Sequence, residues 1–160
     1  MLRRAELRIV GVGALVLAAA VFGWRTVFPS DERQIRRQLT RVAEHVNEKP
    51  QGLSAIAQAA DVASAFADDV VIDLGEGTPI RGRDMVMGIV ARLQPRTSRY
   101  EVRIRDMDVR VDDAGSASVD LSATTSGDNG MDAREFQLAM VKRDGRWLIT
   151  RVTPVHVLEK

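Results

Sequence analysis

The C-terminal half of the chain alternates apolar and polar residues, which is the pattern of half-buried β-strands. The clearest case is residues 135–154, where two apolar runs flank Asp144-Gly145, a preferred pair for a two-residue type I′ hairpin turn. A two-residue loop sets one face of the hairpin as Lys142 opposite Trp147, Met140 opposite Ile149, and Leu138 opposite Arg151. The other face then pairs Val141 with Leu148, Ala139 with Thr150, and Gln137 with Val152. Because both faces are partly apolar, we expect each to be covered.

Two further strands precede this hairpin. Residues 117–123 alternate Ala, Val and Leu with Ser and Asp, as expected for a strand with one buried face. In residues 100–111 the apolar positions change parity after Arg105-Asp106. Since side chains alternate strictly between the two faces of a strand, this change predicts a β-bulge that bends the sheet.

Helical periodicity dominates the first half of the chain. Residues 31–46 carry Ile35, Leu39, Val42 and Val46 at helical spacing, and Asp31 with Gln34 resembles a capping box. An Ala-rich helix is predicted over residues 53–66, with an inner stripe of Leu53, Ile56, Ala60, Ala63 and Phe66. A short strand over 70–74 and a helix from Asp84 to just before Pro95 follow. The sequence therefore predicts an α+β fold, with three helices packed on a bent antiparallel sheet.

The N-terminus predicts a membrane anchor over residues 1–28, followed by one domain over residues 29–160. Arg3, Arg4 and Arg8 precede an apolar run from Ile9 to Trp24, and counting on to Phe28 gives the roughly 20 residues that span a bilayer. A cleaved signal peptide, with a site near Ala18-Ala19-Ala20, and a buried soluble helix are the alternatives. Basic residues flank both ends of the run, so the positive-inside rule does not decide the orientation. The short basic N-terminus is typical of a signal anchor and favours a single-pass protein of the inner (cytoplasmic) membrane, with the domain on the periplasmic or extracytoplasmic side.

Composition narrows the function. The net charge of +1 gives no basic excess, so no nucleic-acid partner is predicted. The chain has no cysteine, which removes disulfides, thiolate chemistry and cysteine-ligated zinc. The basic face of the helix after the anchor, with Arg33, Arg36, Arg37 and Arg41, is in a position to contact anionic headgroups, although an ordinary solvated face is the favoured interpretation.

Three short motifs resemble the NTF2-like superfamily, which includes ketosteroid isomerase and the SnoaL-like proteins. They are Phe66-Ala67-Asp68-Asp69-Val70, Gly82-Arg83 at the start of a helix, and Asp144-Gly145-Arg146-Trp147 at the last hairpin. The resemblance covers residues 31–157. It implies a cone-shaped NTF2-like fold in which helices close a pocket against the concave face of the sheet, while the convex face often pairs subunits.

The resemblance does not carry over the chemistry of ketosteroid isomerase. That site needs an Asp base, and a Tyr with a protonated carboxylic acid for the oxyanion. These roles fall on Leu74, Val42 and Gln137, none of which has the required group. We therefore predict no catalytic residue, and we expect Val42, Leu74, Gln137 and Thr150 to line a pocket.

Other kinds of site find little support in the sequence. His45 and His156 lie far apart, without the spacing of a metal-binding pair. Gly75-Glu76-Gly77 lacks the third glycine and the helix start of a phosphate-binding loop, and no serine stands in a nucleophile elbow. No metal and no cofactor is predicted.

The favoured function is a membrane-anchored, non-catalytic module of the bacterial cell envelope. It would bind a partner protein, a second copy of itself, or a small apolar ligand. The predicted partner or dimer face consists of Phe136, Leu138, Met140, Trp147 and Ile149. One alternative is a SnoaL-like or isomerase-like enzyme with a non-standard site built from His45, Gln137, Thr150 and His156. Another is a subunit of a secretion or conjugation apparatus.

Overall fold

The computed structural model describes residues 30–48, 52–75, 77–93, 101–127 and 130–155. The predicted anchor, residues 1–28, lies outside these ranges. Within them, the helices are too short or too polar to cross a bilayer.

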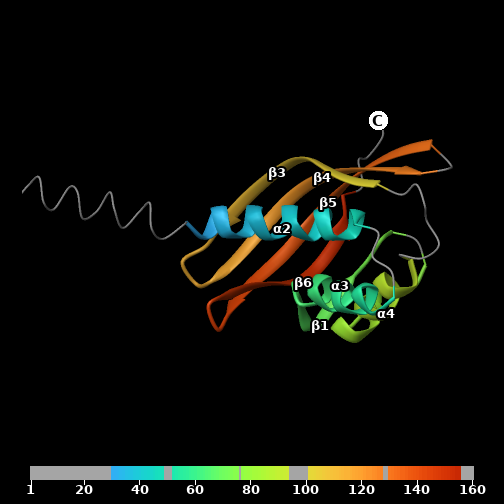
Figure 1. The fold of residues 1–160 in the computed structure, drawn as a ribbon. Helices are drawn as coiled ribbons and strands as arrows, with labels where there is room; N and C mark the ends of the chain where they lie inside the picture. The colour runs from blue at the N-terminus through green and yellow to red at the C-terminus, as the bar shows by residue number, and fades with distance from the viewer. Residues whose placement is uncertain (1–29, 49–51, 76, 94–100, 128–129, 156–160) are drawn as a thin grey trace, which may run out of the picture.

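Three helices and a six-stranded sheet make up the described residues (Figure 1). In chain order they are α2 (Asp31–Asn47), α3 (Leu53–Ala63), β1 (Phe66–Ile72), β2 (Ile80–Arg81), α4 (Arg83–Leu93), β3 (Glu101–Val111), β4 (Ser116–Gly127), β5 (Gly130–Arg143) and β6 (Arg146–Pro154). The strand order in the sheet is β2-β1-β6-β5-β4-β3. Helix α2 lies across the concave face of the bent sheet, and α3 and α4 pack together beside β1 (Figure 1). The predicted α+β class and the bent sheet are confirmed.

The sheet is mixed, so the prediction of a purely antiparallel sheet is wrong. Strand β1 runs parallel to β6, with Phe66 beside Ile149 and Ile72 beside Val152. A parallel pair needs a long crossover, and here the crossover is the whole segment from β2 to β5. Strand β1 also begins at Phe66, earlier than the predicted start at Val70, because α3 already ends at Ala63.

The β5–β6 hairpin has the predicted turn but not the predicted register throughout. Asp144 and Gly145 both have positive φ, at 51° and 75°, as a type I′ turn requires. Met140 lies opposite Ile149 as expected, but the next pair is Ala139 with Arg151. Thr150 is the extra residue of a β-bulge, and its Oγ1 donates to the Ala139 carbonyl at 3.1 Å.

This bulge changes the pairs beyond it. Leu138 lies opposite Val152 instead of Arg151, and Gln137 opposite Thr153 instead of Val152. The shift places the apolar Val152 on the same face as Leu138 and Met140, so the inner face of the hairpin stays apolar along its length. The predicted bulge in β3 is confirmed, since the β3–β4 register shifts between Ile104 and Asp106.

Helix α2 closes the concave side of the sheet. Ile35 is fully buried and Leu39 is 4% exposed, while Val42 and Val46 pack against this core, as the helical spacing predicts. The N-cap is Ser30 rather than the predicted Asp31: its Oγ accepts from the Arg33 amide at 3.4 Å.

Side chains of α2 also bond the backbone of the edge strand β3. The Asn47 side chain donates to the Val102 carbonyl and accepts from the Val102 amide, both at 2.7 Å. Arg36 Nη1 donates to the Met107 carbonyl at 2.5 Å. An edge strand with free backbone groups invites pairing with other chains, and these contacts satisfy part of that edge from within the domain.

Helix α3 buries a different face from the predicted one. Leu53 and Ile56 are 86% and 61% exposed, whereas Gln58, Ala59, Val62 and Ala63 are buried. Most residues of this helix are alanine or small, so the apolar periodicity is weak and packing against neighbouring elements selects the buried face. The predicted inner stripe holds only at Ala63, and at Phe66, which belongs to β1.

Two isoleucines provide a matched test of this packing. Ile35→Ala should lower the free energy of unfolding by about 2–5 kcal/mol, because it leaves a cavity in the core. Ile56→Ala removes the same atoms from an exposed site and should change it by less than about 0.5 kcal/mol. Urea unfolding of the two purified variants, followed by circular dichroism, measures both values. Equal destabilisation by the two substitutions would contradict the placement of α2 and α3.

Candidate functional site

Much of the concave face of the sheet, where the resemblance implies a pocket, is covered by side chains of the described residues. Trp147 and Ile149 are 2% exposed, Met140 is 1% exposed and Leu138 is 4% exposed. They form one core cluster with Ile35 and Leu39 of α2, and the partly buried Phe136 packs against it. The prediction that Phe136, Leu138, Met140, Trp147 and Ile149 form a partner or dimer face is therefore wrong. Helix α2 covers that face. On the other face Leu148 is buried, whereas Gln137 and Ala139 are exposed.

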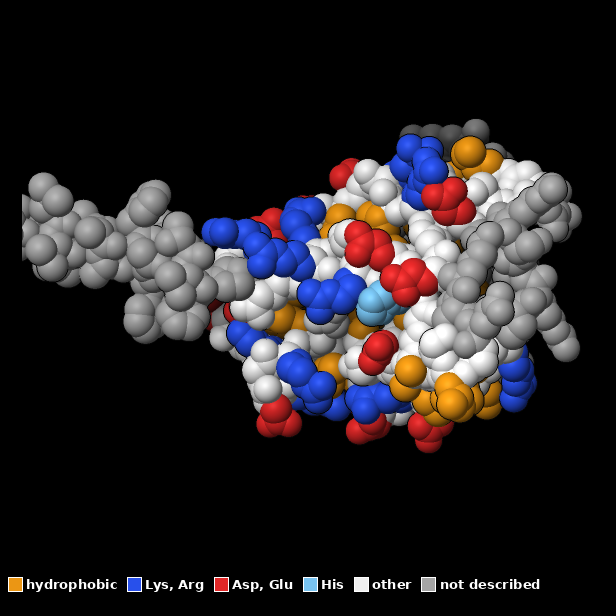
Figure 2. All heavy atoms as spheres, viewed as in Figure 1, with side chains coloured by type: hydrophobic (Ala, Val, Ile, Leu, Met, Phe, Trp, Pro, Cys, Tyr) orange, Lys and Arg blue, Asp and Glu red, His pale blue; other side chains and the backbone are white. Residues whose placement is uncertain are grey.

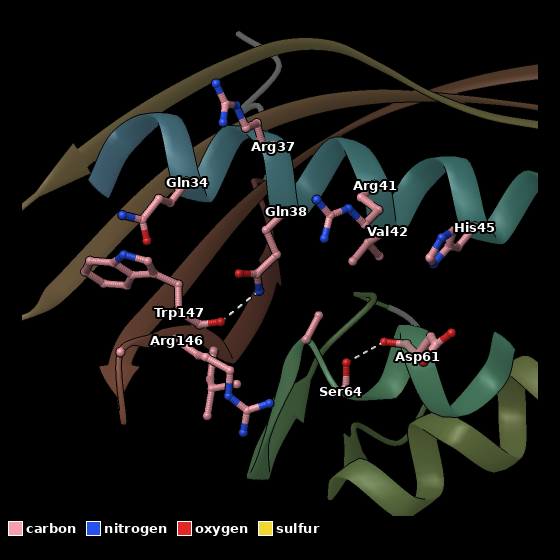
Figure 3. Close-up of a pocket in the computed structure, with 13 residues that line it drawn as sticks. Gln34, Arg37, Gln38, Arg41, Val42, His45, Asp61, Ser64, Arg146 and Trp147 are labelled. Carbon is pink, nitrogen blue, oxygen red and sulfur yellow. Dashed lines mark hydrogen bonds between the residues drawn. The ribbon is translucent and has the colours of Figure 1, made fainter. Parts of the chain in front are cut away.

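An open groove of about 620 Å³ lies between α2, the start of β6 and the end of α3 (Figure 3). Helix α2 contributes Gln34, Arg37, Gln38, Arg41, Val42 and His45. A second wall consists of Asp61 in α3 and of Ser64 and Ala65 directly after it. The third wall belongs to the last hairpin and consists of Gly145, Arg146, Trp147 and Leu148. The groove is therefore lined by a mixture of charged, amide and apolar groups.

Hydrogen bonds from α2 hold the β6 wall of the groove. Gln38 Nε2 donates to the Trp147 carbonyl at 2.8 Å, as Figure 3 shows. Asp31 Oδ1 accepts from the Trp147 indole at 3.2 Å and from Lys142 Nζ at 2.5 Å. The Lys142 ammonium also lies 5.8 Å from the centre of the Trp147 ring, within the range of a cation–π contact.

These contacts shift the ionisation of Asp31. The hydrogen bond from Lys142, with a smaller one from Trp147, lowers the pKa of the Asp31 carboxyl below its usual value, although burial opposes the shift. The ionised form is therefore the one that the fold stabilises.

Gln58 joins the middle of α3 to the C-terminal end of α2. Its Nε2 donates to the His45 carbonyl and, at 3.2 Å, to Glu48 Oε2. Gln58 is only 7% exposed, and among the described residues its Oε1 has no hydrogen-bond partner. The amide satisfies the carbonyl end of α2, where helix hydrogen bonds run out.

The groove contains residue types used in catalysis, but not in a catalytic arrangement. In Figure 3, Arg41 and His45 extend from the lower edge of α2, and Ser64 lies below them. Ser64 Oγ donates to the Asp61 carbonyl at 2.7 Å, and no hydrogen bond joins it to His45 in the described part of the chain. A nucleophilic serine needs a base within hydrogen-bond reach, so this group does not form such a pair.

The four residues expected to line one pocket are not brought together. Val42 lines the groove, whereas Leu74 follows β1 and is 44% exposed. Gln137 lies on the outer face of the sheet, where its Nε2 donates to Asp120 Oδ1 at 3.1 Å. Thr150 is the bulge residue of β6. The alternative enzymatic set also separates, with His45 on the α2 side and Gln137 on the outer face, while His156 lies outside the described residues.

The outer face carries a row of polar residues that periodicity alone did not single out. Asp108, Asp120 and Gln137 lie side by side across β3, β4 and β5. They line a shallow depression of about 560 Å³ together with Asp106 and Glu135. Arg110 binds both Asp108, at 2.9 Å, and Asp120. Among the described residues, no group has the composition and geometry of a metal site.

The comparison with family models identifies the fold family. The SnoaL-like domain matches residues 29–153, most of the chain, and the chain therefore belongs to this family. No curated protein sequence matches it.

Solved structures of this fold share little sequence with the chain. An NTF2-like protein with a cystatin-like fold from Novosphingobium aromaticivorans superposes with a TM-score of 0.66 at 10% identity, covering 87% of this chain and 90% of that one. A candidate aromatic ring hydroxylase from the same organism gives 0.63 at 17% identity, over 81% and 90% of the two chains. A Mycobacterium tuberculosis protein of unknown function gives 0.63 at 19%, over 80% and 78%. At such identities the similarity establishes the fold alone.

The Asp31 contacts predict a pH-dependent contribution to stability. Because the pKa of Asp31 is lowered in the folded state, its contribution is complete above the unfolded pKa of about 3.9 and is lost as the pH falls through the lower folded value. Asp31→Asn should therefore lower the free energy of unfolding at neutral pH by at most about 1 kcal/mol, since both partners are partly solvated.

The difference in the free energy of unfolding between the native protein and the Asp31→Asn variant should become smaller at acidic pH. Urea unfolding at a series of pH values measures it, with Asp113→Asn in an exposed turn as the control. A difference that stays constant down to the most acidic conditions would contradict the assigned role of Asp31.

Proposed function

We propose that this SnoaL-like chain is a membrane-tethered, non-catalytic binding module of the bacterial cell envelope. The observation that carries the proposal is the filled interior. Trp147, Met140 and Ile35, each at most 2% exposed, pack together beneath the concave face, where the family resemblance implies a pocket. Binding then takes place on the outside of the domain, at the groove beside α2.

The groove suits a polar partner better than a small apolar ligand. Small-molecule sites are usually concave and mostly apolar, with a few convergent polar groups. Here Arg41, His45 and Asp61 stand among the lining residues, so an apolar ligand would desolvate charges without replacing their hydration. A protein segment that carries its own polar groups would bind the groove with a smaller desolvation penalty, because its groups replace the lost hydration of the charged side chains. A small apolar ligand remains the second candidate, on the strength of Val42, Ala65 and Leu148 in the lining.

The tether is the run of apolar residues before the domain. Residues 9–28 have the length and the flanking arginines of a single transmembrane span, and the short basic N-terminus favours an extracytoplasmic domain. Because α2 begins at Asp31, the first helix of the domain starts directly after the proposed span.

Cell fractionation tests the tether. The full-length chain should remain in the membrane pellet after alkaline carbonate extraction, because a spanning helix is released only by detergent. A variant lacking residues 1–28 should be found in the supernatant. Added protease should reach the domain from the periplasmic side. A soluble product that begins shortly after Ala20 would show instead that the segment is a cleaved signal peptide.

Native mass spectrometry of the full-length chain, extracted gently in detergent, tests the kind of ligand. The chain should appear with a bound partner protein rather than with a retained small apolar molecule. A small apolar molecule retained by the native chain but not by Val42→Asp, which puts a charge into the groove, would favour the second candidate. Asp61→Asn, in the same groove, is the control for a general loss of binding.

A further inference from the structure

We propose that three arginines of α2 dock the domain on anionic lipid headgroups. Arg33, Arg37 and Arg41, here called the arginine ridge, are the residues involved. The inference rests on the proposed tether, which places α2 next to the bilayer, and adds a specific contact between the domain and the lipid surface.

The ridge is a continuous cationic strip on one flank of α2. Its members are spaced four residues apart, which puts each about 6 Å further along the same side of the helix. All three side chains are exposed, and Arg37 and Arg41 also stand at the edge of the groove. Figure 2 shows basic side chains following α2 from its N-terminal end, with acidic side chains beyond them.

Among the described residues, several basic side chains are neutralised by an acidic partner, whereas those of the ridge are not. Arg36, on the same helix, pairs with Glu32 at 2.9 Å and donates to the Met107 carbonyl. Other pairs in the domain are Arg83 with Asp68, Arg103 with Glu101, Arg110 with Asp108 and Lys142 with Asp31. Within the described ranges, the side chains of Arg33, Arg37 and Arg41 have no such partner. Like charges four residues apart destabilise a helix, so an external anion would relieve a repulsion that the fold leaves in place.

The charge of the exposed side chains changes along α2, from basic near its N-terminus to acidic near its C-terminus. The acids of the first turn are already paired, Asp31 with Lys142 and Glu32 with Arg36. Glu44 and Glu48 come only after the ridge, towards the far end of the helix. The half of α2 nearer to residue 28 is therefore the cationic half, which is the half that a tethered domain would hold closest to the membrane.

The outer face of the sheet suits an anionic membrane less well, because its carboxylates lie beside its arginines and Arg110 binds two of them. The outer face of the sheet presents Asp106, Asp108, Asp120 and Glu135. An anionic surface therefore orients the domain with the exposed flank of α2 towards the lipid and the outer face of the sheet away from it. This orientation predicts lipid-dependent contact at the exposed flank of α2 and no contact at the outer face of the sheet.

Single fluorescent labels on the full-length protein test this orientation. The chain contains no cysteine, so a single introduced cysteine accepts one environment-sensitive dye. The two labelling sites are Thr40→Cys, at an exposed position of α2 between Arg37 and Arg41, and Ala139→Cys, on the exposed outer face of the sheet. The proteins are reconstituted into vesicles of phosphatidylcholine alone or of phosphatidylcholine with phosphatidylglycerol. The dye at position 40 should shift to the blue only with phosphatidylglycerol. The shift should disappear near 1 M salt, where the Debye length is about 3 Å, and the dye at 139 should not respond.

Charge-matched variants identify the residues responsible. In the Thr40→Cys background, the triple change Arg33→Gln, Arg37→Gln and Arg41→Gln should weaken docking by roughly 100-fold, about fivefold for each arginine near the surface. The control removes three exposed arginines elsewhere, through Arg81→Gln, Arg92→Gln and Arg151→Gln, and should keep the response. Circular dichroism of both variants checks that α2 remains folded.

The outcomes separate the ridge from the tether. Vesicle flotation that fails in both lipids, with the native chain, would overturn the tether and the ridge contact with it. Normal flotation with no lipid-dependent shift at position 40, or equal loss in the ridge and control variants, would overturn the ridge contact alone and leave the tether in place.

Discussion

The packing of α2 across the concave face of the sheet is the constraint on which the rest of the domain depends. Its apolar side fills the interior with Ile35 and Leu39 against Trp147 and Met140. Its polar side chains bond the edge strand β3 through Asn47 and the β6 wall through Gln38. Closure by this helix and formation of the described core are therefore the same event. The groove that α2 borders is one of the surfaces that the described residues leave open to ligands or partners.

The elements that could be predicted are those encoded by short-range patterns. The spacing of Ile35 and Leu39 predicts the buried side of α2, Asp144-Gly145 predicts a type I′ turn, and the parity change after Arg105 predicts a bend. Each signal needs only neighbouring residues. The bulge at Thr150 and the parallel pairing of β1 with β6 could not be predicted in this way. The apolar alternation does not reveal the bulge, because both faces of β6 carry apolar residues. The parallel pairing joins segments that are separated by most of the domain.

The same distinction explains the outcome for the site. Val42 and His45 could be placed on α2 from periodicity, but the groove they line also needs Asp61, Ser64 and Trp147, which only the tertiary fold brings near. The predicted partner face was wrong because alternation shows that a face is apolar without showing what covers it. Helix α2 covers it, and so Trp147 is a core residue held by Asp31 and Gln38. In α3 the small side chains gave no clear stripe, and Gln58 proved more buried than Leu53.

The two sides of α2 meet different physical requirements. Its inner side needs Ile35, Leu39 and Arg36 to build the core and to satisfy the edge of the sheet, and this fixes the rotation of α2 about its axis. Once that rotation is set, the four-residue spacing directs Arg33, Arg37 and Arg41 to the exposed flank. A surface that binds this flank favours the folded α2 over its unfolded form, because the strip of charge exists only when the helix is formed. Docking on an anionic surface would therefore stabilise the helix that closes the core, and the strength of that coupling follows the ordinary mass-action relation between binding and folding.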